Sequence, residues 1–264
     1  MGPRRKFSVP APIQKGSLVA GGRLSGRRIL ITGGGSGVGA ATCRLFAAQG
    51  ARIAVLDRDE EALKAIVEET GAISLAANLF DHDATREAVE DAARELGGLD
   101  GVVNCAGISV SLPFAETDMA AWDLAIGGNL TSVYLVCRAA LPYLRNSGAA
   151  TIVSISSGVA MQPLAGRAAY AASKSGVIAF SKVLAMELAP SIRCNVICPG
   201  AIDTPMVRNT FTDPAQIARI ESLYGLKRMG EPQEVADAIL FLTSAESSFV
   251  TGSTLVVDGG RIYY

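Results

Sequence analysis

Histidine is nearly absent from the chain: one residue in 264, His82. A Ser-His-Asp hydrolase would have to depend on this residue alone. It stands between Asp81 and Asp83 at an expected helix start, where a surface or capping role is the better interpretation. The five cysteines are scattered and form no Cys-x-x-Cys pair, so no metal site is predicted and a reducing cytoplasm is expected. Cys194 and Cys198 are interpreted as small buried hydrophobic residues.

Excess charge and long apolar runs are also missing. The net charge is −1 and the pI is about 5.9, which argues against a nucleic-acid surface. We find no apolar run of transmembrane length, because residues 147–166 lack charges but are rich in Ser and Gly, so no membrane association is expected. With 49% apolar residues and 28 glycines, the chain fits a single α/β domain.

Acidic residues are absent before Asp57, and residues 1–26 contain three prolines and several basic residues. This composition predicts a flexible N-terminal arm over 1–26, followed by one folded domain over 27–264. Arg4-Arg5-Lys6-Phe7 resembles a twin-arginine export signal, but Lys15 and the glycines interrupt the apolar region that such a signal needs. We therefore favour an extension of a cytoplasmic protein.

A glycine-rich turn follows the first predicted strand, 28–32, and leads into a helix over 40–49. Glycines let the backbone approach a pyrophosphate, and a helix N-terminus offers it free N–H groups. The next strand, 52–56, ends at Asp57, where a carboxylate can accept hydrogen bonds from an adenosine ribose. The pattern predicts a dinucleotide site whose turn comprises Gly33, Ser36, Gly37, Val38 and Gly39.

The choice between NAD and NADP depends on three neighbouring residues. Asp57 would repel a 2′-phosphate, and Ser36 stands where a basic residue could bind one. Both favour NAD, while the adjacent Arg58 keeps NADP open.

Strands and helices alternate along the rest of the chain. Beyond the first two strands, the pattern predicts helices over 60–69, 84–96 and 231–243, and strands over 72–77, 99–104, 150–156 and 254–257. This alternation predicts a Rossmann-type, doubly wound parallel sheet with helices on both faces. Ligands of such sheets bind at the carboxyl ends of the strands, where Asn104, Ala106 and Gly107 are expected.

Tyr170 and Lys174 lie four residues apart in a predicted helix over 167–189, so they share one face. A free tyrosine has a pKa of about 10, and a cation at about 5 Å lowers it enough for base chemistry only in a partly dry pocket. Ser157 follows the strand 150–156 and can face the same cleft. Asn129 interrupts a long helical stretch over 119–144 near Gly127-Gly128 and needs polar partners.

Together these residues resemble the short-chain dehydrogenase/reductase family over about residues 25–260. The resemblance rests on Thr32-Gly33-x-x-x-Gly37-x-Gly39, Asn104-x-Ala106-Gly107, Asn129, Ser157, Tyr170-x-x-x-Lys174, Pro199-Gly200, Thr251-Gly252 and Asp258-Gly259-Gly260. It implies that Tyr170 is the acid or base, that Lys174 lowers its pKa and binds a ribose, and that Ser157 holds the substrate oxygen. It implies that Asn129 fixes a water linking Lys174 to solvent.

The resemblance also implies further contacts and an assembly. Cofactor positions extend to Asn78, Leu79, Pro199, Gly200, Ile202 and Thr204, with the last two facing the nicotinamide. Asn78 replaces a usual aspartate near the adenine, and Cys105 a common asparagine. Residues 205–228 correspond to a substrate lid, and a homotetramer is the family's default. Expected pocket walls are Ser109, Val110, Met161, Gln162 and Leu164.

The leading hypothesis is hydride transfer between NAD and a medium-sized, largely apolar secondary alcohol or ketone. An NADP-dependent carbonyl reductase stays open. A cofactor-free relative such as a halohydrin dehalogenase is opposed by the intact glycines, Asp57 and Lys174, and an enoyl reductase by the spacing of Tyr170 and Lys174. A dinucleotide sensor without chemistry is opposed by the four filled catalytic positions.

Overall fold

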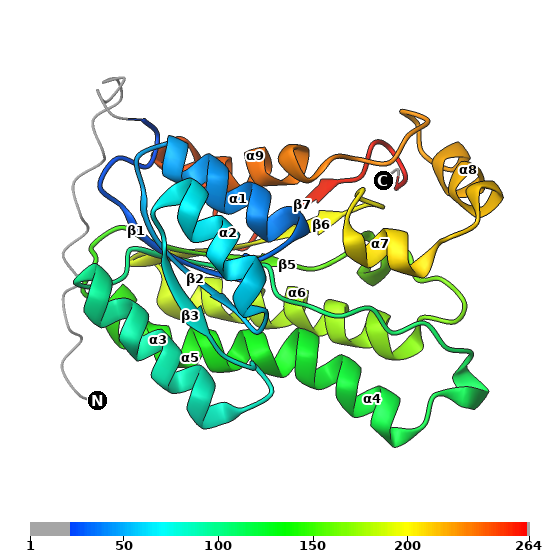
Figure 1. Cartoon of the computed structure of the whole chain (residues 1–264), viewed down its shortest axis with the longest axis horizontal. Helices are drawn as coiled ribbons and strands as arrows, with labels where there is room; N and C mark the ends of the chain where they lie inside the picture. The colour runs from blue at the N-terminus through cyan, green and yellow to red at the C-terminus, as the bar shows by residue number, and fades with distance from the viewer. Residues whose placement is uncertain (1–21, 263–264) are drawn as a thin grey trace, which may run out of the picture.

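The computed structural model describes residues 22–262 and contains one sheet of seven parallel strands between two layers of helices (Figure 1). The strand order is β3-β2-β1-β4-β5-β6-β7. The strands are β1 (Arg28–Thr32), β2 (Arg52–Asp57), β3 (Ile73–Ala76), β4 (Gly101–Asn104), β5 (Ala150–Ile155), β6 (Ile192–Pro199) and β7 (Thr254–Val257). The predicted doubly wound sheet is therefore confirmed.

Helices cover both faces of the sheet: α1, α2 and α9 lie on one, and α3, α5 and α6 on the other (Figure 1). The α-helices are α1 (Gly37–Ala48), α2 (Glu60–Thr70), α3 (His82–Leu96), α4 (Met119–Ile126), α5 (Ser132–Leu144), α6 (Ala168–Leu188), α7 (Pro205–Thr210), α8 (Pro214–Ser222) and α9 (Pro232–Thr243). Short turns are η1 (Phe114–Glu116), η2 (Gly127–Thr131), η3 (Gly158–Ala160) and η4 (Ala245–Ser247).

The central strands are apolar on both sides because each face packs against helices. All six residues of β5 are buried, and Ile152 and Val153 point into the separate cores on the two faces. Cys194 and Cys198 in β6 are fully buried, as expected, and all five cysteines are free thiols. Two closed cores therefore hold the carboxyl ends of the strands in fixed register.

The helical stretch Met119–Leu144 runs without a break, because η2 between α4 and α5 is a π-helical turn. By length and composition alone this stretch could cross a membrane, so the sequence-based statement that no run is long enough was wrong. The sequence pattern predicted an interruption at Gly127-Gly128, which would have divided this stretch into two shorter helices. Its residues Asn129, Val133 and Val136 are buried within the fold, as in a core helix. π-Turns are common at functional sites, and this one carries Asn129.

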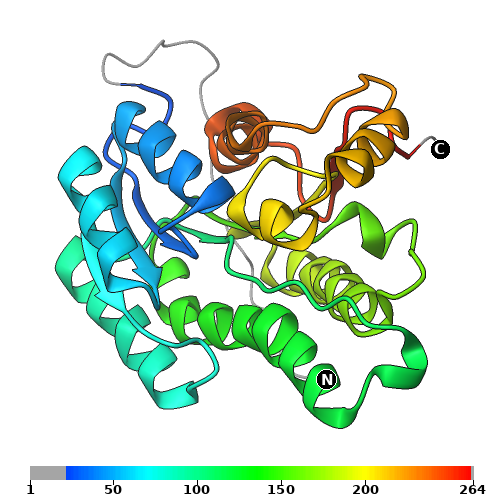
Figure 2. The same cartoon turned by 45° about the vertical axis from the view of Figure 1, so that its right-hand side comes forward.

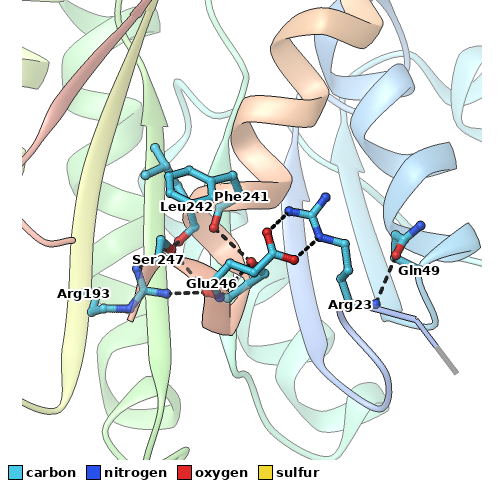
Figure 3. Close-up of polar contacts among 8 residues, drawn as sticks. Arg23, Gln49, Arg193, Phe241, Leu242, Glu246 and Ser247 are labelled. Carbon is cyan, nitrogen blue, oxygen red and sulfur yellow. Dashed lines mark hydrogen bonds and ion pairs between the residues drawn. The ribbon is translucent and has the colours of Figure 1, made fainter. Parts of the chain in front are cut away.

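Residues 22–26, which the sequence assigned to the arm, pack on the domain. Leu24 is fully buried, and the guanidinium of Arg23 pairs with Glu246 in η4 while its backbone N–H donates to Gln49 (Figure 3). Nearby, Arg193 donates to the carbonyls of Leu242 and Ser244 at the end of α9 (Figure 3). The rest of the predicted arm, residues 1–21, lies outside the described residues.

At the amino ends of the strands, away from the glycine turn, Asp100 joins β1, β4 and β5. Its carboxylate accepts hydrogen bonds from the backbone and guanidinium of Arg28 and from the Ser147 hydroxyl. Burial alone would raise the pKa of Asp100, but these hydrogen bonds outweigh it and lower the pKa to about 2. The carboxylate therefore stabilises the fold at neutral pH.

Asp100→Asn is expected to lower the free energy of unfolding at pH 7 by about 1 kcal/mol, since partial exposure screens the interaction. Because the folded pKa lies below the unfolded value of about 3.9, the contribution is complete above pH ~4. It disappears as the pH falls through about 2. Urea unfolding of both proteins at several pH values measures the difference. Asp91→Asn, at an exposed ion pair with Arg94, is the control; equal effects of the two changes would contradict the assignment.

Candidate active site

An open cleft of about 330 Å³ lies at the carboxyl ends of β1 and β4, where the strand order reverses. Rossmann-type sheets bind ligands at this position. Most of the predicted site residues line it: Gly33, Ser36, Gly37, Val38, Gly39, Asp57, Arg58, Asn78, Leu79, Ala106, Gly107, Ser157, Tyr170, Lys174, Pro199, Gly200, Ile202 and Thr204. The topology thus brings together residues up to 171 positions apart, from Gly33 to Thr204.

The glycine turn is packed so closely that side chains would not fit. A Cβ on Gly39 would lie 2.0 Å from the Gly33 carbonyl oxygen, and a Cβ on Gly33 would lie 2.6 Å from the Cα of Ala106. Gly33 has a φ of +66° and Gly37 a φ of +51°, a conformation that favours glycine. The turn therefore presents bare backbone to the cleft.

The first turn of α1 keeps its N–H groups available. The side chain of its N-cap, Ser36, makes no capping hydrogen bond, and no acidic residue stands in the first turn. By contrast, aspartates cap α2, α3, α4 and α8. Uncapped N–H groups and the helix dipole favour an anion, so the turn and α1 together fit a pyrophosphate.

Asp57 lies beside the glycine turn at the end of β2. One carboxylate oxygen accepts the Gly35 N–H at 2.9 Å, and the other accepts the Arg58 N–H at 2.7 Å. These bonds aim the carboxylate along the cleft wall. A Cβ on Gly35 would lie 2.8 Å from the Ala62 side chain, so no larger residue fits between the turn and α2.

At the other side of the cleft, Tyr170 and Ser157 line the wall together. Burial raises the pKa of Tyr170, while the nearby Ser157 side chain and the charge of Arg167 lower it. Ser157 is positioned by the turn after β5, where its hydroxyl accepts the Val159 N–H at 3.2 Å. A phenol and a hydroxyl that lie close together can both contact one substrate oxygen, and the phenol can exchange a proton with it.

Lys174 lies one helical turn after Tyr170 and is 4% exposed. Its ammonium donates to the Ile155 carbonyl at 2.9 Å, and burial lowers its pKa to about 8. A Cβ on Gly107 would lie 2.9 Å from Asn129 Oδ1 and 3.2 Å from Lys174 Nζ, so a side chain there would press on both groups. The side chain is therefore held in place and is close to losing its proton at neutral pH.

Two of the predicted catalytic and cofactor-binding residues, Asn129 and Asn104, lie outside the lining of the cleft. Asn129 is fully buried: its oxygen accepts the Ile108 N–H at 2.9 Å, and its Nδ2 donates to Ile108 and Ser173. It thereby fixes the loop after β4 to α6. Asn104 is 1% exposed and donates to Ser154 on β5 and to Cys137, so its side chain joins strands instead of reaching the cleft.

The segment predicted as a lid contains α7 and α8. Its ends meet where Asp203 N–H donates to Gly230 O and Gly230 N–H donates to Ala201 O, at 2.8 and 2.9 Å. Leu226 N–H donates to Gly259 O, so the returning half lies beside the C-terminal segment, drawn red in Figure 2. Met206 and Val207 on α7 line the cleft.

Sequence reasoning missed several residues here. The apolar lining also includes Leu56, Ala77, Phe80, Ile108 and Ile155. Cys105 lines the cleft too, and burial raises its pKa to about 12, which makes its thiol unreactive. The prediction of the pocket walls was wrong: the lining of the cleft includes none of Ser109, Val110, Met161, Gln162 and Leu164. Gln162 and Leu164 are exposed instead. Arg167 was predicted only as the first residue of the helix over 167–189, and its contact with the Tyr170 ring could be found only from the structure.

The chain was compared with known proteins. A family model described as enoyl-(acyl carrier protein) reductase matches residues 33–261. A 3-oxoacyl-[acyl-carrier-protein] reductase of Thermotoga maritima is 39% identical over 246 residues, 91% of this chain and 99% of that protein. A cyclopentanol dehydrogenase of Comamonas sp. is 38% identical over 245 residues, which are 90% of this chain and 98% of that protein. A Brucella melitensis structure titled as a short-chain dehydrogenase/reductase superposes with a TM-score of 0.87 at 34% identity, covering 92% of this chain and 99% of its own.

Proposed function

Since the chain belongs to the short-chain dehydrogenase/reductase family of oxidoreductases, we propose that it transfers hydride between NAD(H) and a secondary alcohol or ketone. One observation carries the proposal: Tyr170, Ser157 and Lys174 line the same cleft as the bare glycine turn. The cleft thus combines a site for proton transfer with a site that fits a dinucleotide.

The residues that would hold the cofactor follow from the cleft. The N–H groups of the glycine turn and of α1 bind the pyrophosphate, and Asp57 accepts hydrogen bonds from the adenosine ribose. Lys174 is placed to bind the second ribose. When bound, the nicotinamide supplies the hydride acceptor or donor.

In alcohol oxidation Tyr170 accepts the hydroxyl proton of the substrate, and Ser157 donates a hydrogen bond to the oxygen on which negative charge develops. In ketone reduction Tyr170 returns the proton. Lys174, with a pKa of about 8, can exchange its own proton near neutral pH and so reset the charge beside the phenol.

The substrate we propose is a medium-sized, largely apolar alcohol or ketone. Ile108, Met206 and Val207 line the cleft with apolar side chains, which favours such a molecule. Cyclopentanol dehydrogenase, by its name, acts on a cyclic secondary alcohol, and it covers almost the whole of this chain. Cyclic secondary alcohols therefore belong first in a substrate screen.

For the cofactor we propose NAD. Asp57 lines the cleft beside the glycine turn, and its negative charge would repel a 2′-phosphate bound next to it. NADH is expected to bind at least about tenfold more tightly than NADPH, a difference of about 1.4 kcal/mol. Asp57→Asn is expected to remove most of this preference. Titrations followed by nicotinamide fluorescence measure both affinities, and turnover of secondary alcohols with the preferred oxidised cofactor completes the test.

Asp118→Asn is the matched control, since Asp118 caps α4 and an asparagine caps equally well. If NADPH bound as tightly as NADH, the exposed Arg58 at the cleft would explain it, and an NADP-dependent carbonyl reductase would replace this proposal. If neither nucleotide bound at micromolar concentration, the proposed function would fail.

A further inference from the structure

Arg167 lies over the phenol ring of Tyr170, with its guanidinium carbon 5.2 Å from the ring centroid. Its Nη1 donates to the Ser109 hydroxyl at 2.6 Å and to the Val110 carbonyl at 3.3 Å. The side chain therefore spans from the start of α6 to the loop after β4. Next to it, Leu112 N–H donates to Gly166 O at 2.9 Å, which joins the same two segments.

The backbone also fixes Arg167. Its carbonyl oxygen accepts a hydrogen bond from the Ala171 N–H at 2.7 Å, in the first turn of α6. Arg167 itself is three residues before Tyr170. A cation over an aromatic face is attracted to the ring, and the planar guanidinium suits this stacking better than an ammonium. The ring of Tyr170 is thus held on a platform anchored at two points.

Besides burial, the groups that shift the pKa of the Tyr170 phenol come from three elements. Arg167 is the N-cap of α6, the Cys198 thiol belongs to β6, and Ser157 lies in the turn after β5. Lys174 is the other cation of α6, one helical turn after Tyr170. Cys198 raises the pKa of Tyr170, whereas Ser157 and Arg167 lower it against the larger effect of burial.

The two cations differ in how long they keep their charge. Burial lowers the pKa of Lys174 to about 8, so its ammonium loses its proton before a phenol with a raised pKa does. A guanidinium keeps its proton at every working pH. Arg167 is therefore the protein cation that still acts on the phenol while it ionises.

We propose that Arg167 is a positioning residue of the active site: it fixes the ring of Tyr170 and supplies a permanent positive charge that favours the phenolate. The inference rests on the proposed function, in which Tyr170 exchanges the proton. Arg167 contacts the face of the Tyr170 ring, so its effect on the reaction passes through the tyrosine.

The test separates charge from positioning with three variants. Arg167→Met removes the charge, Arg167→Lys keeps it without the planar fork, and Ser109→Ala removes one anchor. For Arg167→Met, the rise of kcat/KM for alcohol oxidation with pH should move to higher pH, and kcat/KM at pH 7 should fall on the order of tenfold. Arg167→Lys should restore the pH profile. Ser109→Ala should lower kcat a few-fold without moving the profile.

A second readout needs no turnover. With [¹³Cζ]tyrosine labelling, the NMR signal that is absent in Tyr170→Phe reports the ionisation of Tyr170 directly. In Arg167→Met this titration should move to higher pH, and in the control Arg94→Met, an exposed arginine of α3, it should stay unchanged. NADH affinity should be unchanged in all variants.

The inference would be overturned if the pH profile of kcat/KM and the NMR titration of Arg167→Met superposed on those of the parent protein. It would also be overturned by a loss of kcat that is equal at every pH, because such a loss would indicate support of the fold alone. If Arg167→Met did not fold, Arg167→Lys and Ser109→Ala would still decide, since a moved profile in either contradicts the charge argument. Failure of the proposed function would show differently: no nucleotide binding and no turnover in the parent, while the NMR titration still tests Arg167.

Discussion

Tyr170→Phe is expected to lower kcat for alcohol oxidation on the order of 10³-fold, because the ring stays in place while the only group that exchanges the substrate proton is lost. Tyr170 and Ser157 line one part of the cleft, whereas the glycine turn and Asp57 lie at its other end. NADH affinity should therefore stay within about twofold of the parent value. Initial rates and a fluorescence titration on the same preparation measure both quantities.

Tyr134→Phe is the matched control, since Tyr134 on α5 is 48% exposed and its ring packs edge-on against Phe180. It should leave kcat unchanged. If Tyr170→Phe kept more than about a tenth of the parent kcat, proton transfer by this tyrosine would be excluded as the source of the rate.

Much of this architecture could be predicted because the signals are local. A strand, a glycine turn and a helix are contiguous, and Asp57 follows at a spacing that one βαβ unit fixes. The spacing of Tyr170 and Lys174 likewise needs only the period of a helix. The parallel sheet follows from the alternation of these units.

What could not be predicted depends on long-range packing. Asn104 sits at a strand end, yet its side chain turns toward Ser154 of the neighbouring strand, a choice that the register of β4 and β5 decides. Arg167 meets Ser109 only because the loops after β4 and β5 converge. The cytoplasmic location and the homotetramer stay predictions, as does the role of residues 1–21.

The electrostatics show the same division. From the sequence, Lys174 was the cation expected to lower the pKa of Tyr170. In the fold its burial lowers its own pKa to about 8, and the permanent charge comes from a residue outside the motif. Burial, which the sequence does not quantify, decides up to what pH the Lys174 ammonium keeps its charge.

Gly39→Ala is expected to reduce NADH affinity on the order of 100-fold, as the loss of about two hydrogen bonds to a charged group would. The added Cβ would lie 2.0 Å from the oxygen and 2.7 Å from the carbon of the Gly33 carbonyl, which are backbone atoms. The turn must therefore move away from α1, and its N–H groups with it. Calorimetric titration with NADH measures the loss.

The same change tests which of two opposing effects on stability is larger. Alanine within a helix is ordinarily better than glycine by about 1 kcal/mol. Here overpacking against backbone costs about 1–3 kcal/mol or more, so a net loss is expected. Urea unfolding gives its size, and a variant as stable as the parent with full NADH affinity would contradict the close approach of Gly39 to Gly33.

Gly71→Ala separates this close approach from backbone strain. Gly71 ends α2 with a φ of +68°, and a Cβ there would meet nothing within 4 Å. Its replacement should cost about 1–2 kcal/mol of stability through the left-handed conformation alone, with NADH affinity unchanged. Gly39 lies inside a right-handed helix, so its replacement carries a clash without that strain. A loss of NADH affinity confined to Gly39→Ala would therefore mean that NADH binding needs the close approach of Gly39 to the Gly33 carbonyl, because this contact holds the N–H groups of the turn in place.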